Sequence, residues 1–416
     1  MCCDPATQRA LRPHRISRWL IVAGVITTTI IAGSRPSELL GQTASVRDSS
    51  GIRIVANPAP LTERVLYRIS ETPLVDIGGL SDDPQAELAA VASAVRLANG
   101  NLVITQYSSQ PKVSELRVFD PRGRYVRTIG RIGDGPGEFR EIERVFRIGG
   151  DSLLTYDGAG RVNYFDSAGR FARPETFTRP LVGRFTDGSF LVSASYATPS
   201  RPRTPSEAAF GARDSIRLFH ASASAVIDSG RPFPDGARDV VSGVRVLIPY
   251  SSLPAIAVDF DRFCFAQGGA FTISVHAPNG KPTALIHVSL APVKIKEVNV
   301  ARELELLLKN KPPQVVAINR EKYAKHAADY PAFSSLVVDA SHRLWASTSA
   351  RFGESTMRWF VFAPDGRLQG SVTLLAKLRV LEIGTDYLLG TIMDSDDALR
   401  VRVYSLIAPR AREVPR

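Results

Sequence analysis

The stretch of sequence that decides the fold is LRVFDPRGRYVRTI, which runs from Leu116 to Ile129. Apolar and polar residues alternate on both sides of the Pro-Arg-Gly centre, so each flanking strand has one face that can be buried. Proline sets φ near about −65°, and the glycine that follows permits a positive φ. The stretch therefore predicts two antiparallel strands joined by a tight turn.

The same strand–turn–strand unit recurs along the chain. Clear copies lie at 162–171, 274–281 and 359–368, a degenerate copy begins at Arg217, and 402–406 ends the series. A turn followed by a short apolar strand forms a second unit, whose copies are 99–105, 149–155, 187–193, 261–266, 341–346 and 384–389. Repeats of this kind, spaced by roughly 40–50 residues, are typical of four-stranded propeller blades. The two series together predict six such sheets.

The ends of such a series are expected to meet. A ring that pairs its first and last strands leaves no exposed sheet edge at the closure. We therefore expect a strand at 73–77 or at 51–56 to complete the sheet that contains residues 386–407.

Two insertions interrupt the repeats. Residues 198–213 are polar and rich in proline, which indicates a loop. Residues 297–330 have helical spacing of apolar side chains, first over 297–309 and then over about 315–329, with a stop at Pro331. This insertion is open to two interpretations, a lid or docking element and a piece that simply packs on the flank of the repeats.

One connector is unusually rich in glycine. The segment IGRIGDGPGEF, residues 129–139, contains Gly130, Gly133, Gly135 and Gly137 and ends in Phe139. It resembles the signature of NHL repeats, and the chain resembles in particular the exported bacterial six-bladed propellers. The resemblance covers roughly residues 70–407 and implies an all-β, six-bladed β-propeller with a central channel and, here, a small helical insertion. The glycines give backbone freedom for a sharp crossing between sheets, and Phe139 can anchor it as an apolar wedge.

The N terminus is predicted to direct export. Arginines at 9, 12, 15 and 18 precede an uncharged, largely apolar run of residues 19–33, the order found in secretory signal peptides. The run is short for a membrane-spanning helix. We divide the chain into residues 1–44, a signal peptide or an N-terminal inner-membrane anchor, and residues 45–416, the propeller. Either way we expect a periplasmic or extracellular protein.

Bulk composition argues against several classes of function. The net charge is +11, but the arginines that cause it are spread along the chain, so we expect no nucleic-acid partner. Of three cysteines only Cys264 lies outside the N terminus, in an apolar run typical of a buried residue. The six histidines show no metal-ligand spacing. We predict no metal and no cofactor.

The connector also supplies the candidate ligand site. If it lies at a channel mouth, Arg131 and Arg140, with Glu138, are the best candidates to hold an anionic ligand or a partner carboxylate. Salt bridges between blades are the alternative. We favour a monomeric binding or scaffold module for a protein or glycan, with membrane contact only through an uncleaved N-terminal segment. A metal-dependent lyase or lactonase is the second hypothesis, by analogy of fold alone. It requires three or four inward-facing acceptor groups at one end of the channel.

Overall fold

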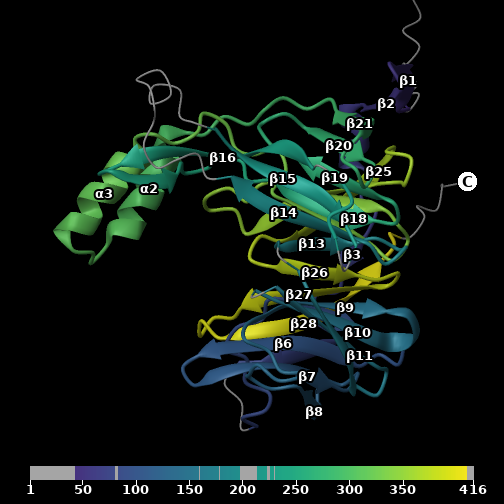
Figure 1. Ribbon diagram of the computed structural model, residues 1–416. Coiled ribbons are helices and arrows are strands. Elements are labelled where there is room, and N and C mark those ends of the chain that lie inside the picture. The colour runs from purple at the N-terminus through teal and green to yellow at the C-terminus, as the bar shows by residue number, and fades with distance from the viewer. Residues whose placement is uncertain are drawn as a thin grey trace, which may run out of the picture. The chain divides into compact units, whose positions relative to one another are not determined.

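The computed structural model describes residues 43–79, 83–158, 160–177, 179–196, 213–222, 225–228 and 230–409 (Figure 1). The predicted targeting segment and all of the predicted loop 198–213 except Arg213 lie outside these ranges. Strands dominate the described residues, as the predicted all-β class requires. Among the described helices, none is long and apolar enough to cross a membrane.

The strands form six sheets, each built mainly from consecutive, antiparallel strands. In chain order the sheets contain β5 (Ala94–Arg96), β6 (Leu102–Ser109), β7 (Lys112–Phe119) and β8 (Tyr125–Ile129); β9 (Ile142–Ile148), β10 (Ser152–Asp157), β11 (Arg161–Phe165) and β12 (Phe171–Thr176); β13 (Leu181–Arg184), β14 (Phe190–Tyr196), β15 (Arg213–Ala221), β16 (Arg231–Val241) and β17 (Val244–Leu247); β18 (Ala255–Asp259), β19 (Arg262–Ala266), β20 (Thr272–His276) and β21 (Pro282–Val288); β22 (Ser335–Val338), β23 (Leu344–Ser347), β24 (Thr356–Phe362) and β25 (Leu368–Leu375); and β26 (Arg379–Ile383), β27 (Tyr387–Met393) and β28 (Leu399–Ile407). Four N-terminal strands join two of these sheets: β1 (Ser45–Ser49), β2 (Ile52–Asn57), β3 (Arg68–Ile69) and β4 (Val75–Gly78). Short 3₁₀ turns lie at Ala59–Glu63 and Gly149–Asp151.

The sheets are arranged as a ring. The first strands of neighbouring sheets contact one another, as β5 does with both β9 and β26, so these strands are the innermost of each sheet. Apolar side chains are buried between adjacent sheets; one such cluster contains Leu116 and Ile129 from the first sheet and Val145 and Phe165 from the second. Each sheet therefore buries its alternating side chains against its neighbours, and the ring has several cores rather than one.

Both predicted repeat units occupy the expected places. The strand–turn–strand units are the two outer strands of a sheet, and the turn–strand units lead into the second strands. An aspartate organises the outer turn. Asp120 Oδ1 accepts hydrogen bonds from the backbone N–H groups of Arg122 and Arg124, while Arg124 Nε donates to Oδ2 at 2.8 Å. Asp166 binds Arg170 in the same way. This Asp-x-x-x-Arg pattern holds the turn from both sides.

The N-terminal strand β4 closes the ring. It pairs antiparallel with β28, with Ile77 opposite Val401 and Val75 opposite Val403. The predicted strand at 73–77 thus completes the last sheet, and the alternative at 51–56 does not. That segment, β2, instead pairs parallel with β21 and adds an outer strand to the fourth sheet. Buried Asn57 fixes it there, because its Nδ2 donates to the carbonyls of His287 and Gly366 and its Oδ1 accepts from Leu368 N–H.

The predicted helical insertion consists of α2 (Glu297–Leu308) and α3 (Pro313–Tyr323). The second helix is shorter than the expected 315–329. Residues after Tyr323 turn back instead: Ile295 N–H donates to the carbonyl of Ala328, and Tyr330 N–H donates to that of Val293. This bridge buries Tyr330 against Ile295, which a continued helix would not allow. In Figure 1 the two helices stand beside β16.

The antiparallel order gives the ring two unlike ends. One end, here called the turn end, carries the short turns between the first and second and between the third and fourth strands of each sheet. The other, the connector end, carries the connections between sheets, which include the glycine-rich segment, β17 and the two helices. Bonds between neighbouring sheets staple the turn end: Arg96 N–H to Glu382, Ala98 N–H to Asp151, Thr186 N–H to the Phe260 carbonyl, His342 to Asp259, and Ala340 N–H to the Ile383 carbonyl.

Ile77 provides a test of the closure. Its side chain is almost fully buried between the last and first sheets, so Ile77→Ala should lower the free energy of unfolding by about 2–5 kcal/mol. Val126→Ala, in the half-exposed outer strand β8, should change it by no more than about 0.5 kcal/mol. Urea unfolding followed by circular dichroism measures both. Equal, small effects would show that β4 does not close the ring.

Candidate functional site at the connector end

The glycine-rich connector joins β8 of the first sheet to β9 of the second. Gly130 has a φ of +68°, and a Cβ there would lie only 2.6 Å from the carbonyl oxygen of Gly137. Only glycine tolerates both conditions. Phe139 is fully buried between the two sheets, in contact with the same cluster as Ile129 and Phe165. The connector is thus a compact loop around one apolar anchor.

The charged residues of this connector are paired with one another. Arg131 Nε donates to Glu138 Oε1 at 2.7 Å, and Glu138 Oε2 accepts from Gly135 N–H at 2.8 Å. These two bonds, the backbone one first, hold the pKa of Glu138 below its usual value. Arg140 Nε donates to Asp134 Oδ1 at 2.5 Å. Both candidate arginines are well exposed, yet each already has a carboxylate partner.

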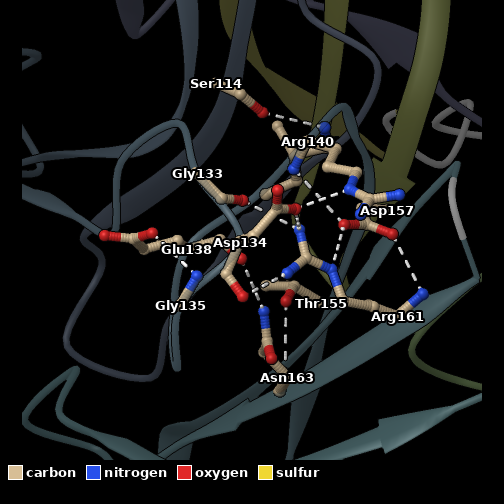
Figure 2. A network of polar contacts seen from close by, with 11 residues as sticks. Ser114, Gly133, Asp134, Gly135, Glu138, Arg140, Thr155, Asp157, Arg161 and Asn163 are labelled. Carbon is tan, nitrogen blue, oxygen red and sulfur yellow. Dashed lines mark hydrogen bonds and ion pairs between the residues drawn. The ribbon is translucent and has the colours of Figure 1, made fainter.

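A buried carboxylate ties the connector to the second sheet (Figure 2). Asp157 accepts from Arg161 through both its backbone and its guanidinium, and from Arg140 N–H at 3.3 Å. Arg161 reaches across to donate to the carbonyls of Gly133 and Asp134. Asn163 Nδ2 donates to the carbonyl of Glu138. These contacts give the loop a single shape. The part of Arg131, Glu138 and Arg140 in ligand binding stays a prediction.

Two other arginines on the innermost strands lack such partners. The side chain of Arg144, in β9, makes no hydrogen bond or ion pair with any described residue, and Arg379 opens β26 in the last sheet. Arg379 Nη2 donates to the carbonyls of Val91 and Ala92 at 2.7 Å, and no described carboxylate pairs with it. Ser93, next in the chain, donates to the Val145 carbonyl at 3.3 Å. Segment 91–93 therefore connects the neighbourhoods of the two arginines, here called the arginine pair.

The electrostatics of the arginine pair are unusual. Both side chains are exposed to solvent, yet desolvation by surrounding protein lowers the pKa of each. The charge of Arg144 lowers the pKa of Arg379 further, because like charges repel. Guanidinium pKa values lie above about 12, so both groups stay cationic. Two solvent-exposed cations that repel each other favour an anion between them.

Other chemistry-bearing residues are engaged structurally. His220, His276 and His287 lie on strands, where each ring binds a hydroxyl or a carbonyl, and burial lowers the pKa of His276. His326 binds Glu297, and His342 binds Asp259 at the turn end. Within the described residues, no group of three or more His, Cys, Asp or Glu side chains could hold a metal ion.

Comparison with known proteins agrees with this architecture. A family profile, DUF5128, described as a 6-bladed beta-propeller, matches residues 88–175, which span the first two sheets and their connector. The chain is a six-bladed β-propeller. No curated protein matches it in sequence.

Solved structures similar to this propeller are distant in sequence. A protein of Bacteroides fragilis assigned as exported is 14% identical, with a TM-score of 0.46 over 86% of this chain and 100% of its own. A DUF4221-family member from Bacteroides vulgatus is 12% identical, with a TM-score of 0.42 over 83% and 99%. The calcium-binding protein regucalcin from Agrobacterium tumefaciens is 11% identical, with a TM-score of 0.38 over 83% and 97%.

No motif in the sequence marks the arginine pair. Arg144 is one of several charged residues in the stretch from Arg131 to Arg144, and Arg379 belongs to no recognisable motif. Their relation depends on ring closure, which brings β26 beside β5 and β5 beside β9. One signal was available: each arginine begins or nearly begins the strand that follows an inter-sheet connection, and such positions point to the connector end.

Cys264 gives a direct check of burial in this propeller. Its side chain is buried in β19, and desolvation raises the pKa of its thiol to about 12. Because the thiolate is the reactive form, iodoacetamide should leave Cys264 unmodified in mildly alkaline buffer and modify it after guanidinium unfolding. Peptide mass spectrometry reads both states. Rapid modification of the folded protein would show that β19 is not part of a packed sheet.

Proposed function

We propose that the protein is an exported binding module that holds an oxyanion of its ligand between Arg144 and Arg379. The observation that supports this most directly is that neither guanidinium makes an ion pair or hydrogen bond with a described carboxylate, although the charge of Glu143 acts on Arg144. The ligand is a protein or glycan that presents a carboxylate, sulfate or phosphate. Export is supported by the basic and apolar order of the N-terminal segment.

The chemistry of arginine suits this role. A guanidinium offers planar, paired donors that match the two oxygens of a carboxylate or phosphate, and it is less strongly hydrated than an ammonium. Arg379 uses Nη2 for the carbonyls of Val91 and Ala92, which orients its remaining donors. No described residue accepts a hydrogen bond from the side chain of Arg144, so its donors can all turn toward a ligand. One oriented and one adaptable arginine therefore supply the site.

The position of the pair also supports binding. Sites for ligands are commonly built from loops on one face of a rigid scaffold. The turn end is stapled by bonds between sheets, whereas the connector end carries β17, the two helices and the arginine pair. A ligand that enters at the connector end meets the arginine pair without displacing any of those staples.

The alternative, a metal-dependent lyase or lactonase, has weaker support. It needs several inward-facing Asp, Glu, Asn or His groups at one end of the ring. At the connector end the inner strands present Arg144 and Arg379 instead, and two cations oppose a divalent metal ion. Glu143 lies beside Arg144 and feels the charges of Glu141 and Asp157, but among the described residues these carboxylates do not form a group that could hold a metal ion. We therefore favour a binding function over a catalytic one.

Thermal unfolding with citrate and with inorganic phosphate, at constant ionic strength, tests the proposal. An anion at ten times its Kd stabilises a protein by about 1.4 kcal/mol, which raises the Tm of a domain of this size by roughly 2 °C. Arg144→Gln and Arg379→Gln should each abolish the rise. Arg131→Gln and Arg140→Gln are matched controls, because these arginines lie nearby but already have carboxylate partners, and they should keep it.

The same variants distinguish a binding site from structural arginines. Without added anion, Arg144→Gln should leave Tm unchanged or raise it slightly, because it removes repulsion from Arg379 and breaks no side-chain bond. An anion effect that vanishes in Arg131→Gln or Arg140→Gln and persists in Arg144→Gln would move the site to the glycine-rich connector. No Tm rise with either anion would contradict the proposal.

A further inference from the structure

The end of the helical insertion exposes apolar side chains that nothing in the described chain covers. We define the helical tip as residues 306–320, from the last turn of α2 into α3. Leu306 is 59% exposed, Leu307 41%, Val315 38% and Ile318 42%. Single exposed apolar side chains are common on protein surfaces, whereas a group of them in one short stretch indicates an interaction site.

The base of the insertion, by contrast, is firmly attached. Val300 of α2 packs with Ile295 and Tyr330, and the hydroxyls of Tyr250 and Tyr323 both donate to Glu303. Burial, together with the charge of Glu303 and the hydrogen bond to it, raises the pKa of Tyr323 to about 12, so the hydroxyl stays a donor. Toward β16, Lys325 binds the Val240 carbonyl and Asp239. The tip is therefore held out on a fixed base, and α3 itself buries no residue.

The charge of the tip has one sign. Between Glu305 and Glu321 the sequence contains Lys309, Lys311 and Arg320 and no aspartate or glutamate. All three cations are exposed, and none has an ion-pair partner among the described residues. Glu305 and Glu321 border the tip, but within it the apolar side chains lie only among cations, so the tip complements a surface that is both apolar and anionic.

The two helices also leave an open cavity beside the tip. Its volume is about 600 Å³, and its lining includes Leu304, Leu306 and Leu308 together with two cations, Lys309 and Arg320, and one anion, Glu305. An aliphatic wall next to two cations matches the two parts of an anionic phospholipid, the acyl chain and the phosphate. A protein partner of the same tip would instead need carboxylates placed to meet these cations.

We propose that the helical tip docks on the surface of an anionic phospholipid bilayer. Leu306 and Leu307 would enter the boundary between headgroups and acyl chains, while Lys309 and Lys311 meet the phosphates. Stable attachment to a membrane commonly takes two weak signals. The tip supplies one signal that is independent of the N-terminal segment. The inference goes beyond ligand binding by the arginine pair and does not depend on it.

A tryptophan placed on the tip tests this in the full chain. Leu306→Trp is mixed with vesicles of phosphatidylcholine and phosphatidylglycerol whose acyl chains carry bromine, a quencher of tryptophan emission. We expect the emission that the introduced tryptophan adds to that of the wild-type protein to be quenched by these vesicles. Brominated vesicles of phosphatidylcholine alone should not quench it. Leu74→Trp is the matched control, because Leu74 is equally exposed at 59% but precedes β4 at the turn end. Its added emission should stay unquenched.

Charge reversal tests whether the lysines of the tip carry the contact with lipid. In the Leu306→Trp background, Lys309→Glu with Lys311→Glu should weaken binding to the anionic vesicles at least about tenfold, since each lysine contributes roughly fivefold near such a surface. Three results would overturn the proposal: unquenched Leu306→Trp emission, equal quenching of Leu74→Trp, or quenching that charge reversal leaves unchanged. A dimer in light scattering that Leu306→Ser with Leu307→Ser abolishes would assign the tip to a second copy of the chain instead.

Discussion

The pairing of β4 with β28 is the constraint on which the rest of the structure depends. Without it, the last sheet ends in an open edge and Val401 and Val403 lose the strand opposite them. The apolar cluster between the last and first sheets includes Ile77, Leu102 and Val401, so closure also completes that interface. Because each sheet buries its side chains against two neighbours, one open interface weakens both sheets beside it. A strand from the N-terminal part of the chain thus completes the sheet that the C-terminal strands form.

Closure also explains why the two ends of the ring differ in chemistry. At the turn end, short hairpins approach one another, and groups such as Glu382 and Asp259 bind across to the next sheet. At the connector end the chain must travel between sheets, and there it accommodates the glycine-rich loop, β17 and the helices. The arginine pair lies at this connector end, where Arg379 bonds to the carbonyls of Val91 and Ala92 and Ser93 bonds to that of Val145.

The repeated hairpins could be predicted from sequence because their turns are local. Asp120, Gly123 and Arg124 organise a turn within five residues, and alternation marks the strands beside it. The innermost strands were harder to locate because a strand such as β5 has only three residues, too few to show a period. Two choices depended on distant partners. Segment 51–56 joins the fourth sheet, where the side chain of the adjacent Asn57 hydrogen-bonds to Gly366, a residue distant in sequence. The arginine pair forms only when β26, β5 and β9 lie side by side.

Native-state hydrogen exchange of the backbone amides in β4 and β28 tests the closed ring most directly. An amide whose hydrogen bond breaks only when the whole protein unfolds exchanges through complete unfolding, whereas an amide in a frayed strand exchanges through local opening. The account predicts that protected amides of Val75–Gly78 and of Val401–Val403 share one exchange free energy, equal to that of the β6–β7 hairpin, and that it falls with denaturant at the slope of global unfolding. Rapid, denaturant-independent exchange of β4 while β6 and β7 stay protected would contradict it.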